Sequence, residues 1–315
     1  MNAPQADTAR PATSKIDQTL LGLGLMTLGF LCYSVADACA KGLSGQLHPI
    51  QIAWFRQTGL LAVALWMLSR QGPRILRTRR PVLQLLRGFA AAASATCFIT
   101  SVRYVPLADS VAVSFVAPFV VTVLGALVLR EPVGRRRWIA VAIGLAGTLI
   151  VIRPGLGMLH PAILLVVVAA SLFALRQILS RLIGTVDSTQ TTIAYSALTS
   201  VLLLTVPMLF VWRTPVGGTT IGLLCLIALA AGIGEFFVIR ALELAQAVVL
   251  APLQYSMILW STTFGWLFFS QLPDHWTLIG AAIICGSGLY TLHRERLAIR
   301  ERRRAAMTAE RLMPR

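Results

Sequence analysis

Apolar runs of about 20 residues follow one another along this chain, with only short polar breaks between them. A helix of that length crosses the hydrocarbon core of a bilayer and satisfies its backbone hydrogen bonds internally. Charged residues make up 13% of the 315 residues, about half the usual share in soluble domains. The sequence therefore predicts an all-α integral membrane protein and excludes a soluble enzyme, a disordered chain and a secreted disulfide scaffold.

We expect about ten transmembrane helices, of which the fifth and tenth are short enough to need flanking arginines or a thinned bilayer. Residues 1–19 are polar, so the first span is expected to be a retained helix and not a cleaved signal. The expected spans are residues 20–41, 50–68, 83–103, 107–129, 138–152, 162–183, 191–212, 220–241, 246–269 and 277–292.

Arginine-rich loops set the expected orientation. The loops after the second and fourth spans and the tail after the tenth carry clustered arginines, and all three lie on the side of the two termini. By the positive-inside rule, that side is the cytoplasm. The net charge of +16 thus reflects orientation and contact with lipid headgroups, and no nucleic-acid partner is expected.

The chain resembles itself at an offset of about 140 residues. Tyr33 and Asp37 in the first span match Phe173 and Gln177 in the sixth, and residues 103–108 and 240–245 both read R-x3-L-A. Five spans per half is an odd number, so the halves are expected to be inverted repeats. Such repeats place a binding site near the midplane and permit alternating access.

This pattern divides the chain into two repeats and two terminal segments. The expected parts are residues 1–17 (a cytoplasmic N-terminal segment), 18–155 (the first repeat), 158–293 (the second repeat) and 294–315 (a basic cytoplasmic tail).

A family resemblance rests on several short motifs. The run Val113-Ser-Phe-Val-Ala-Pro118, followed by Leu129-Arg-Glu-Pro132 and Gly144-Leu-Ala-Gly147, resembles an EamA domain of the drug/metabolite transporter superfamily. The second half is similar but looser, with Gln271-Leu-Pro273 where the family often has a Gly-Glu pair. The segments Asp37-Ala-Cys-Ala-Lys41, Gln51-Ile-Ala-Trp-Phe-Arg56 and Leu86-Arg-Gly88 together resemble the branch of bacterial S-adenosylmethionine and riboflavin uptake proteins. The resemblance implies a ten-helix secondary carrier with a central cavity, in a bacterial inner membrane.

Four ionisable residues lie deep within the expected spans. Asp37, Arg56, Arg176 and Glu235 each cost roughly 2.5–3.5 kcal/mol to insert unless a partner or water compensates. Their formal charges sum to zero, and their depths predict an Asp37–Arg56 pair and an Arg176–Glu235 pair. Two interpretations stay open: ion pairs that only hold helices together, or side chains that face a water-filled cavity and bind substrate.

Further candidate binding residues are polar or aromatic side chains at depth. Tyr33 lies four residues before Asp37, so both share one helix face. Gln254 and Tyr255 follow Pro252, whose missing N–H frees a carbonyl one turn earlier. Packing and lipid contact are equal alternatives for each aromatic residue. The complete set of candidate substrate-binding residues is Tyr33, Asp37, Trp54, Arg56, Arg176, Gln177, Glu235, Gln254 and Tyr255.

Charged residues near span ends are expected to snorkel or to cap loops instead. This group comprises Asp109, Arg87, Arg103, Arg240, Lys41 and Arg181, while Glu131 is expected to pair with a neighbouring arginine. The five cysteines lie in apolar runs without a CxxC pair, so neither a disulfide nor a metal site is expected.

The sequence thus predicts a secondary transporter that moves a small polar metabolite by alternating access, with the bilayer as its other partner and no cofactor. The resemblance favours uptake of a vitamin or nucleoside-like metabolite such as riboflavin or S-adenosylmethionine. Export of amino acids or drugs is the alternative, and a non-transporting receptor or scaffold is a third possibility. No GxxxxGK[ST] motif of a P-loop pump occurs and no histidine lies well inside a span, so an enzyme is not expected. The oligomeric state stays open.

Overall fold

A computed structural model describes residues 15–130, 134–153, 160–184, 186–245 and 250–290, together with residues 293 and 297. Within these ranges every regular element is a helix, as the sequence predicts. Most of the expected N-terminal segment, Glu131 and most of the basic tail lie outside the described residues.

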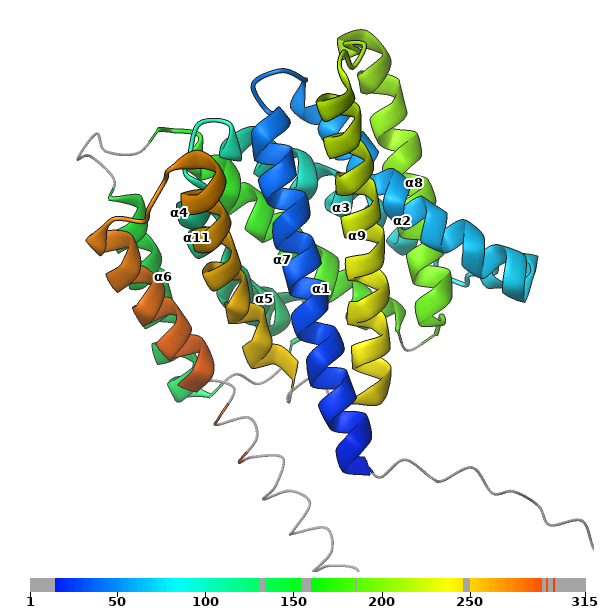
Figure 1. The fold of residues 1–315 in the computed structure, drawn as a ribbon. Helices are drawn as coiled ribbons and strands as arrows, with labels where there is room; N and C mark the ends of the chain where they lie inside the picture. Colours follow the sequence, from blue (N-terminus) through cyan, green and yellow to red (C-terminus); the bar gives the residue numbers. More distant parts are fainter. Residues whose placement is uncertain are drawn as a thin grey trace, which may run out of the picture.

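The helices follow one another in an order that matches the expected spans (Figure 1). They are α1 (Lys15–Leu43), α2 (Pro49–Gln71), the short 3-10 helix η1 (Pro73–Leu76), α3 (Pro81–Val102), α4 (Leu107–Ser114), α5 (Ala117–Val128), α6 (Arg135–Ile152), α7 (Ile163–Ile183), α8 (Thr189–Val211), α9 (Gly218–Leu244), the 3-10 helix η2 (Ala251–Tyr255), α11 (Ser256–Phe269) and a last helix over residues 275–290.

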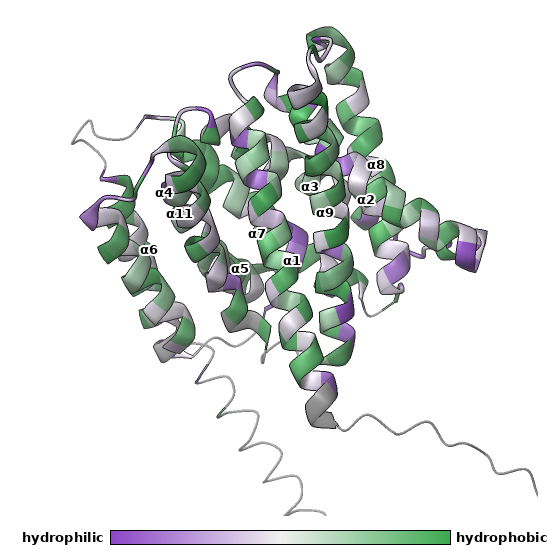
Figure 2. Ribbon diagram, viewed as in Figure 1, coloured by the Kyte–Doolittle hydropathy of each residue, from purple (hydrophilic) through white to green (hydrophobic). Residues whose placement is uncertain are grey.

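Seven helical stretches in the described part of the chain are long and apolar enough to cross a membrane. They correspond to the expected spans one to four and six to eight. The apolar stretch Trp138–Ile152, helix α11 and residues 275–290 are shorter, and they fall where spans five, nine and ten are expected. Apolar residues cover most of the helical surface, with hydrophilic residues mainly toward the helix ends (Figure 2). The protein is therefore an all-helical, multi-pass membrane protein.

The expected fourth and ninth spans are both interrupted next to a proline. Helix α4 ends at Ser114, and α5 begins just before Pro118. In the second half, η2 contains Pro252 and leads into α11. Proline has no N–H to continue a helical hydrogen-bond ladder, which accounts for both breaks.

The second helix of each half begins in the same way. His48 caps α2, its Nδ1 accepting the backbone N–H of Ile50 at 3.3 Å. Ser188 caps α8, its hydroxyl accepting the N–H of Thr191 at 3.1 Å. A side chain that accepts an unpaired N–H in the first turn stabilises a helix start. The two caps lie 140 residues apart in the sequence.

The longest interfaces join α1 to α9 and α3 to α7, and α1 and α9 run side by side in Figure 1. Gly29 of α1 faces Gly234 of α9 so closely that a Cβ on Gly29 would lie 3.1 Å from the Gly234 carbonyl oxygen. On the other interface, the Ser94 hydroxyl of α3 donates to the Ala169 carbonyl of α7 at 2.8 Å. Small residues at these positions permit close helix approach.

Helix α2 also packs on α9, and α3 on α8. Gly59 of α2 touches the backbone of Ala228, where an added Cβ would lie only 1.8 Å from the carbonyl oxygen. Gly88 of α3 faces Thr199 of α8, where a Cβ added to Gly88 would lie 2.5 Å from the Thr199 Cβ. Each of these positions accepts only glycine without a shift of the neighbouring helix.

Helix α6 and the last helix pair at one edge of the molecule (Figure 1). An added Cβ on Gly147 would lie 3.0 Å from the Gly280 carbonyl oxygen. Further along, the Ser287 hydroxyl donates to the Ala140 carbonyl at 2.5 Å. These contacts are related by an offset of 140 residues. Gly29–Gly234 corresponds to Ala169–Ser94, Gly59–Ala228 to Thr199–Gly88, and Gly147–Gly280 to Ser287–Ala140.

The bundle ends differently at its two poles. We call the pole where α1 passes into α2 the α1–α2 end; its buried side chains form an apolar cluster that contains Leu43, Leu47, Ile52, Leu224 and Ile227. Nearby, the Gln51 side chain bonds the backbone of Arg213 through both its nitrogen and its oxygen.

We call the pole where α7 passes into α8 the α7–α8 end, and it is held by hydrogen bonds. The Asp187 carboxylate accepts from the Thr78 hydroxyl, from Gln84 Nε2 at 3.0 Å and from the backbone N–H of Arg79 at 3.2 Å. Gln84 also donates to the Thr192 hydroxyl at 3.3 Å. These bonds join the first half of the chain to the second.

Candidate binding cavity

A cavity of about 230 Å³ lies between helices of both halves. Its walls come from α1, α2, α3, α4, α5, α7, α9, η2 and α11. Its volume is slightly below the range of roughly 300–1,000 Å³ typical of small-molecule sites. Six of the nine candidate residues line it: Tyr33, Asp37, Arg56, Arg176, Glu235 and Gln254.

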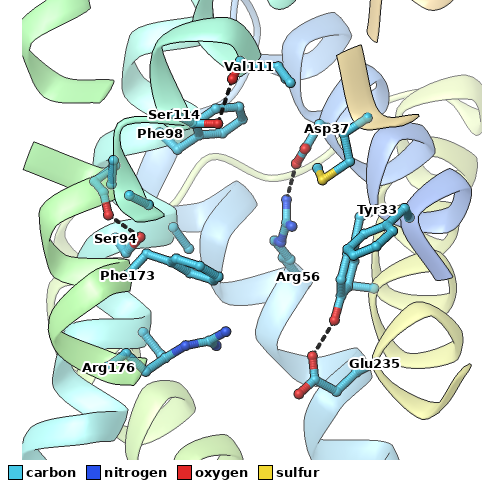
Figure 3. Close-up of a pocket in the computed structure, with 18 of the residues that line it drawn as sticks. Tyr33, Asp37, Arg56, Ser94, Phe98, Val111, Ser114, Phe173, Arg176 and Glu235 are labelled. Carbon is cyan, nitrogen blue, oxygen red and sulfur yellow. Dashed lines mark hydrogen bonds and ion pairs between the residues drawn. The ribbon is translucent and has the colours of Figure 1, made fainter. Parts of the chain in front are cut away.

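The expected Asp37–Arg56 ion pair is formed. A guanidinium nitrogen of Arg56 on α2 donates to the Asp37 carboxylate on α1 (Figure 3). The side chain of Asp37 is only 5% exposed, and that of Arg56 is 20% exposed. Removing one partner would leave an uncompensated buried charge, which typically costs about 3–5 kcal/mol.

The expected Arg176–Glu235 pair is wrong. Glu235 on α9 accepts a hydrogen bond from the Tyr33 hydroxyl of α1 instead (Figure 3). The reason is packing: α9 lies directly against α1 through the Gly29–Gly234 contact, whereas α7 packs on α3. The cavity therefore separates Arg176 from Glu235.

Arg176 reaches into the cavity from α7 and faces the wall that carries Glu235 (Figure 3). The carbon of its guanidinium group lies 4.8 Å from the centroid of the Phe173 ring, a cation–π contact within the same helix. Within the described part of the chain, its side chain forms no hydrogen bond and no ion pair.

Three candidate residues lie outside the cavity lining. Trp54 donates from its indole nitrogen to the Thr205 hydroxyl at 2.9 Å, between α2 and α8. Gln177 is exposed on α7, because a helix turns about 100° per residue and the neighbouring Arg176 occupies the cavity face. Tyr255 stacks on Phe115, with ring centroids 5.0 Å apart.

Several residues that line the cavity were not among the candidates predicted from the sequence. Phe173 flanks Arg176, while Ser94 and Ser114 supply hydroxyl groups in the upper part of the view in Figure 3. The internal repeat offered a signal for Phe173, which matches Tyr33, but isolated serines within apolar runs carried none.

Charges near the span ends behave in different ways. Lys41 caps α3 as expected, donating to the carbonyls of Val102 at 2.9 Å and Val105 at 2.8 Å. Arg240 pairs with Glu243 at 2.7 Å on the surface. Asp109 is buried at the start of α4.

Arg87 does not snorkel outward as expected. It donates to the Ser180 hydroxyl at 2.7 Å, to the Thr192 carbonyl at 3.4 Å and to the Ser196 hydroxyl. These acceptors lie on α7 and α8, so Arg87 of α3 extends the hydrogen-bonded α7–α8 end toward the membrane interior. In the described part of the chain, no cluster of acidic, histidine or cysteine side chains is arranged to hold a metal ion.

Comparison with known proteins shows which family and which transporters this chain resembles. Residues 20–153 match the EamA-like transporter family. The S-adenosylmethionine uptake transporter of Rickettsia felis is 29% identical over 281 residues, covering 89% of this chain and 95% of that protein. The riboflavin transporter of Rhizobium johnstonii is 26% identical over 293 residues, covering 88% of this chain and 93% of the relative.

An exporter is also among the relatives. The pseudopaline exporter CntI of Pseudomonas aeruginosa is 26% identical over 278 residues, covering 85% of this chain and 95% of that protein. The family match thus covers the first half of the chain, and nearly the whole chain is similar to bacterial membrane transporters. The resemblance read from the sequence, including the S-adenosylmethionine and riboflavin branch, is confirmed.

Proposed function

We propose that this protein is a secondary transporter that carries a small polar metabolite across the bacterial inner membrane by alternating access. The observation that carries the proposal is the cavity, which is lined by two carboxylates and two guanidinium groups from helices of both halves. Ionisable groups inside a membrane protein normally face a water-filled pathway or a ligand.

We also propose ten membrane helices in two inverted repeats, residues 18–155 and 158–293. The support is the offset of 140, which relates the Gly59–Ala228 contact to Gly88–Thr199 and the Gly29–Gly234 contact to Ser94–Ala169. Inverted repeats provide two equivalent packings of the halves around one site, which is the structural basis of alternating access.

Both termini are proposed to face the cytoplasm. With this orientation, the arginine-rich loop of residues 70–80 lies on the cytoplasmic side, in agreement with the positive-inside rule. The α7–α8 end then faces the cytoplasm and the α1–α2 end faces the outside.

Uptake is the direction we favour, because the S-adenosylmethionine relatives match a large share of the chain and are named as uptake transporters. Export is the second candidate, and the similarity to the pseudopaline exporter supports it. A receptor or scaffold without transport would not require the facing charges of the cavity.

Flux into proteoliposomes that contain only this protein tests the proposal. A panel of labelled vitamins, nucleosides and amino acids would be assayed with the wild type and with Ala95→Trp, which fills the cavity from α3. Leu203→Trp adds the same bulk on an exposed face of α8 and serves as the control. We expect flux in the wild type and the control and none in Ala95→Trp. Equal flux in all three would contradict a transport route through this cavity.

A further inference from the structure

Two of the four charged side chains around the cavity form no ion pair within the described residues. Asp37 and Arg56 neutralise each other. Glu235 is bonded to the neutral phenol of Tyr33, and Arg176 has only the ring of Phe173 beside it within the described residues. One carboxylate and one guanidinium group therefore face the same cavity from different walls without forming an ion pair with each other (Figure 3).

Helix packing keeps these two charges apart. Helix α9, which carries Glu235, is held against α1 at Gly29 and Gly234. Helix α7, which carries Arg176, is held against α3 by the Ser94–Ala169 hydrogen bond. Unpaired charge in a membrane interior is costly, so a bound molecule with complementary charges gains free energy at both walls.

We propose that Arg176 is the subsite for a carboxylate of the substrate and that Glu235 is the subsite for a cationic group on the same molecule. The transported class is then a zwitterionic metabolite. This inference rests on the proposed transport function and specifies which substrates it serves.

The charges on the two walls of the cavity argue against other classes of substrate. A planar guanidinium matches a carboxylate through two parallel N–H donors, and the Phe173 ring lies 4.8 Å from the guanidinium carbon of Arg176. A phosphate monoester carries about 1.5 to 2 negative charges at neutral pH, which exceeds the single positive charge of Arg176. Riboflavin has no ionised group at neutral pH and would leave both Arg176 and Glu235 unmatched.

The test is uptake of chemically matched probes into proteoliposomes. S-adenosylmethionine and its decarboxylated form differ only in the carboxylate, and riboflavin is the uncharged probe. The variants are Arg176→Gln, Arg176→Lys and Arg181→Gln. Arg181 lies on the same helix, is exposed and does not line the cavity, so its replacement is the matched control. Rates are normalised to the amount of protein inserted, and Arg176→Lys keeps a cation should the glutamine variant insert poorly.

We expect the wild type and Arg181→Gln to take up the carboxylated probe at least about tenfold faster than the decarboxylated one, because a lost charge-assisted hydrogen bond costs about 1.5–3 kcal/mol. Arg176→Gln should abolish this preference, and Arg176→Lys should retain part of it. Equal uptake of the two probes by the wild type, or an undiminished preference in Arg176→Gln, would overturn the proposal. Uptake of riboflavin alone would overturn the proposal of a zwitterionic substrate but would still support the proposed transport function. No flux of any probe would count against transport itself.

Discussion

The α1–α2 end and the α7–α8 end occupy equivalent places in the proposed repeats, yet they are built from opposite chemistry. At an offset of 140, Asp187 corresponds to Leu47 and Gln84 to Leu224. Arg87 likewise corresponds to Ile227. The first residue of each pair belongs to a hydrogen-bonded network, and the second belongs to a buried apolar cluster.

This difference shows that the two ends are held together by unlike forces. An apolar cluster is stabilised by area removed from water, without demands on direction. A network of hydrogen bonds contributes modestly when complete and becomes costly when one buried partner is missing. In the proposed alternating access each end opens in turn, so the unlike chemistry would bias which end opens more easily.

The largest effect should follow from placing a charge in the apolar cluster. Leu47→Asp buries a carboxylate where no donors are arranged to receive it, and we expect a loss of roughly 3–5 kcal/mol. Denaturant titration in detergent micelles measures the loss. The reciprocal change Asp187→Leu should cost only about 1–3 kcal/mol, because Thr78 and the backbone of Arg79 are not buried and the buried Gln84 keeps its hydrogen bond to Thr192. Equal losses for both changes would remove the distinction between the ends.

A smaller effect should appear as opening of the α7–α8 end. Asp187→Leu removes the acceptor shared by Thr78 and Gln84, so the closed state of this end should weaken by about 1.4 kcal/mol, or tenfold. In a cysteine-free background, a cysteine at Ser94 in the cavity should then react about ten times faster with a reagent supplied from the cytoplasmic side.

The double change Gln84→Leu with Asp187→Leu provides the matching control. It removes the buried donor together with the acceptor, leaves only the less buried donors Thr78 and Arg79, and copies the chemistry of Leu224 and Leu47 at the other end. Replacing both polar partners by apolar groups is often nearly neutral, so labelling should return toward the wild-type rate. Labelling as fast as in Asp187→Leu would show that the hydrogen bonds do not hold this end closed.

The smallest effect should be a difference in acid sensitivity. Burial, together with the charges of Arg213 and Arg103, lowers the pKa of His48 below its ordinary value of 6.5. Neutral His48 caps α2, so its stabilisation is complete above pH 6.5 and is lost as the pH falls through the lowered value. The expected loss is about 0.5–2 kcal/mol, the usual worth of a helix cap.

The other end should not respond over this range. Burial alone would raise the pKa of Asp187, but hydrogen bonds from Thr78 and Gln84 outweigh it and hold the pKa below its ordinary value of 3.8. Its contribution is therefore complete above pH 3.8 and is lost only at lower pH. Thermal unfolding between pH 7.5 and 5 should show the same slope in the wild type and in Asp187→Asn, and a shallower slope in His48→Asn, where His160 still accepts the N–H of Ala162 at 3.1 Å. An undiminished slope in His48→Asn would place the acid-sensitive group elsewhere.

Hydropathy alone predicted most of the fold. The length of each apolar run located the helices, and the depth of Asp37 and Arg56 was enough to pair them, because adjacent helices joined by a short loop must lie close together. The expected depth of Arg176 and Glu235 in the membrane gave a wrong pairing, since depth does not specify which helices distant in the sequence touch each other. That choice depends on small residues such as Gly29 and Gly234, whose contact brings α9 onto α1.

Helix rotation explains the remaining errors in the site. Trp54 and Gln177 lie at the right depth on the right helices, but they point away from the cavity. A shift of one residue in an assumed helix face turns a side chain by about 100°, and apolar residues on every side of a membrane helix leave that face unmarked. Where two polar residues recur four positions apart, as for Tyr33 and Asp37, the sequence indicated a shared helix face, and both side chains line the cavity.

The facing charges of Arg176 and Glu235 also bear on the energy source for transport. A zwitterion that matches them adds no net charge, so the loaded and the empty cavity carry the same charge through the bilayer. A membrane voltage acts with about 2.3 kcal/mol per elementary charge for every 100 mV, and it does not distinguish between two forms of equal charge. For such a substrate the electrical potential across the membrane supplies no direct driving force, and accumulation follows the gradient of the solute or of a co-transported ion.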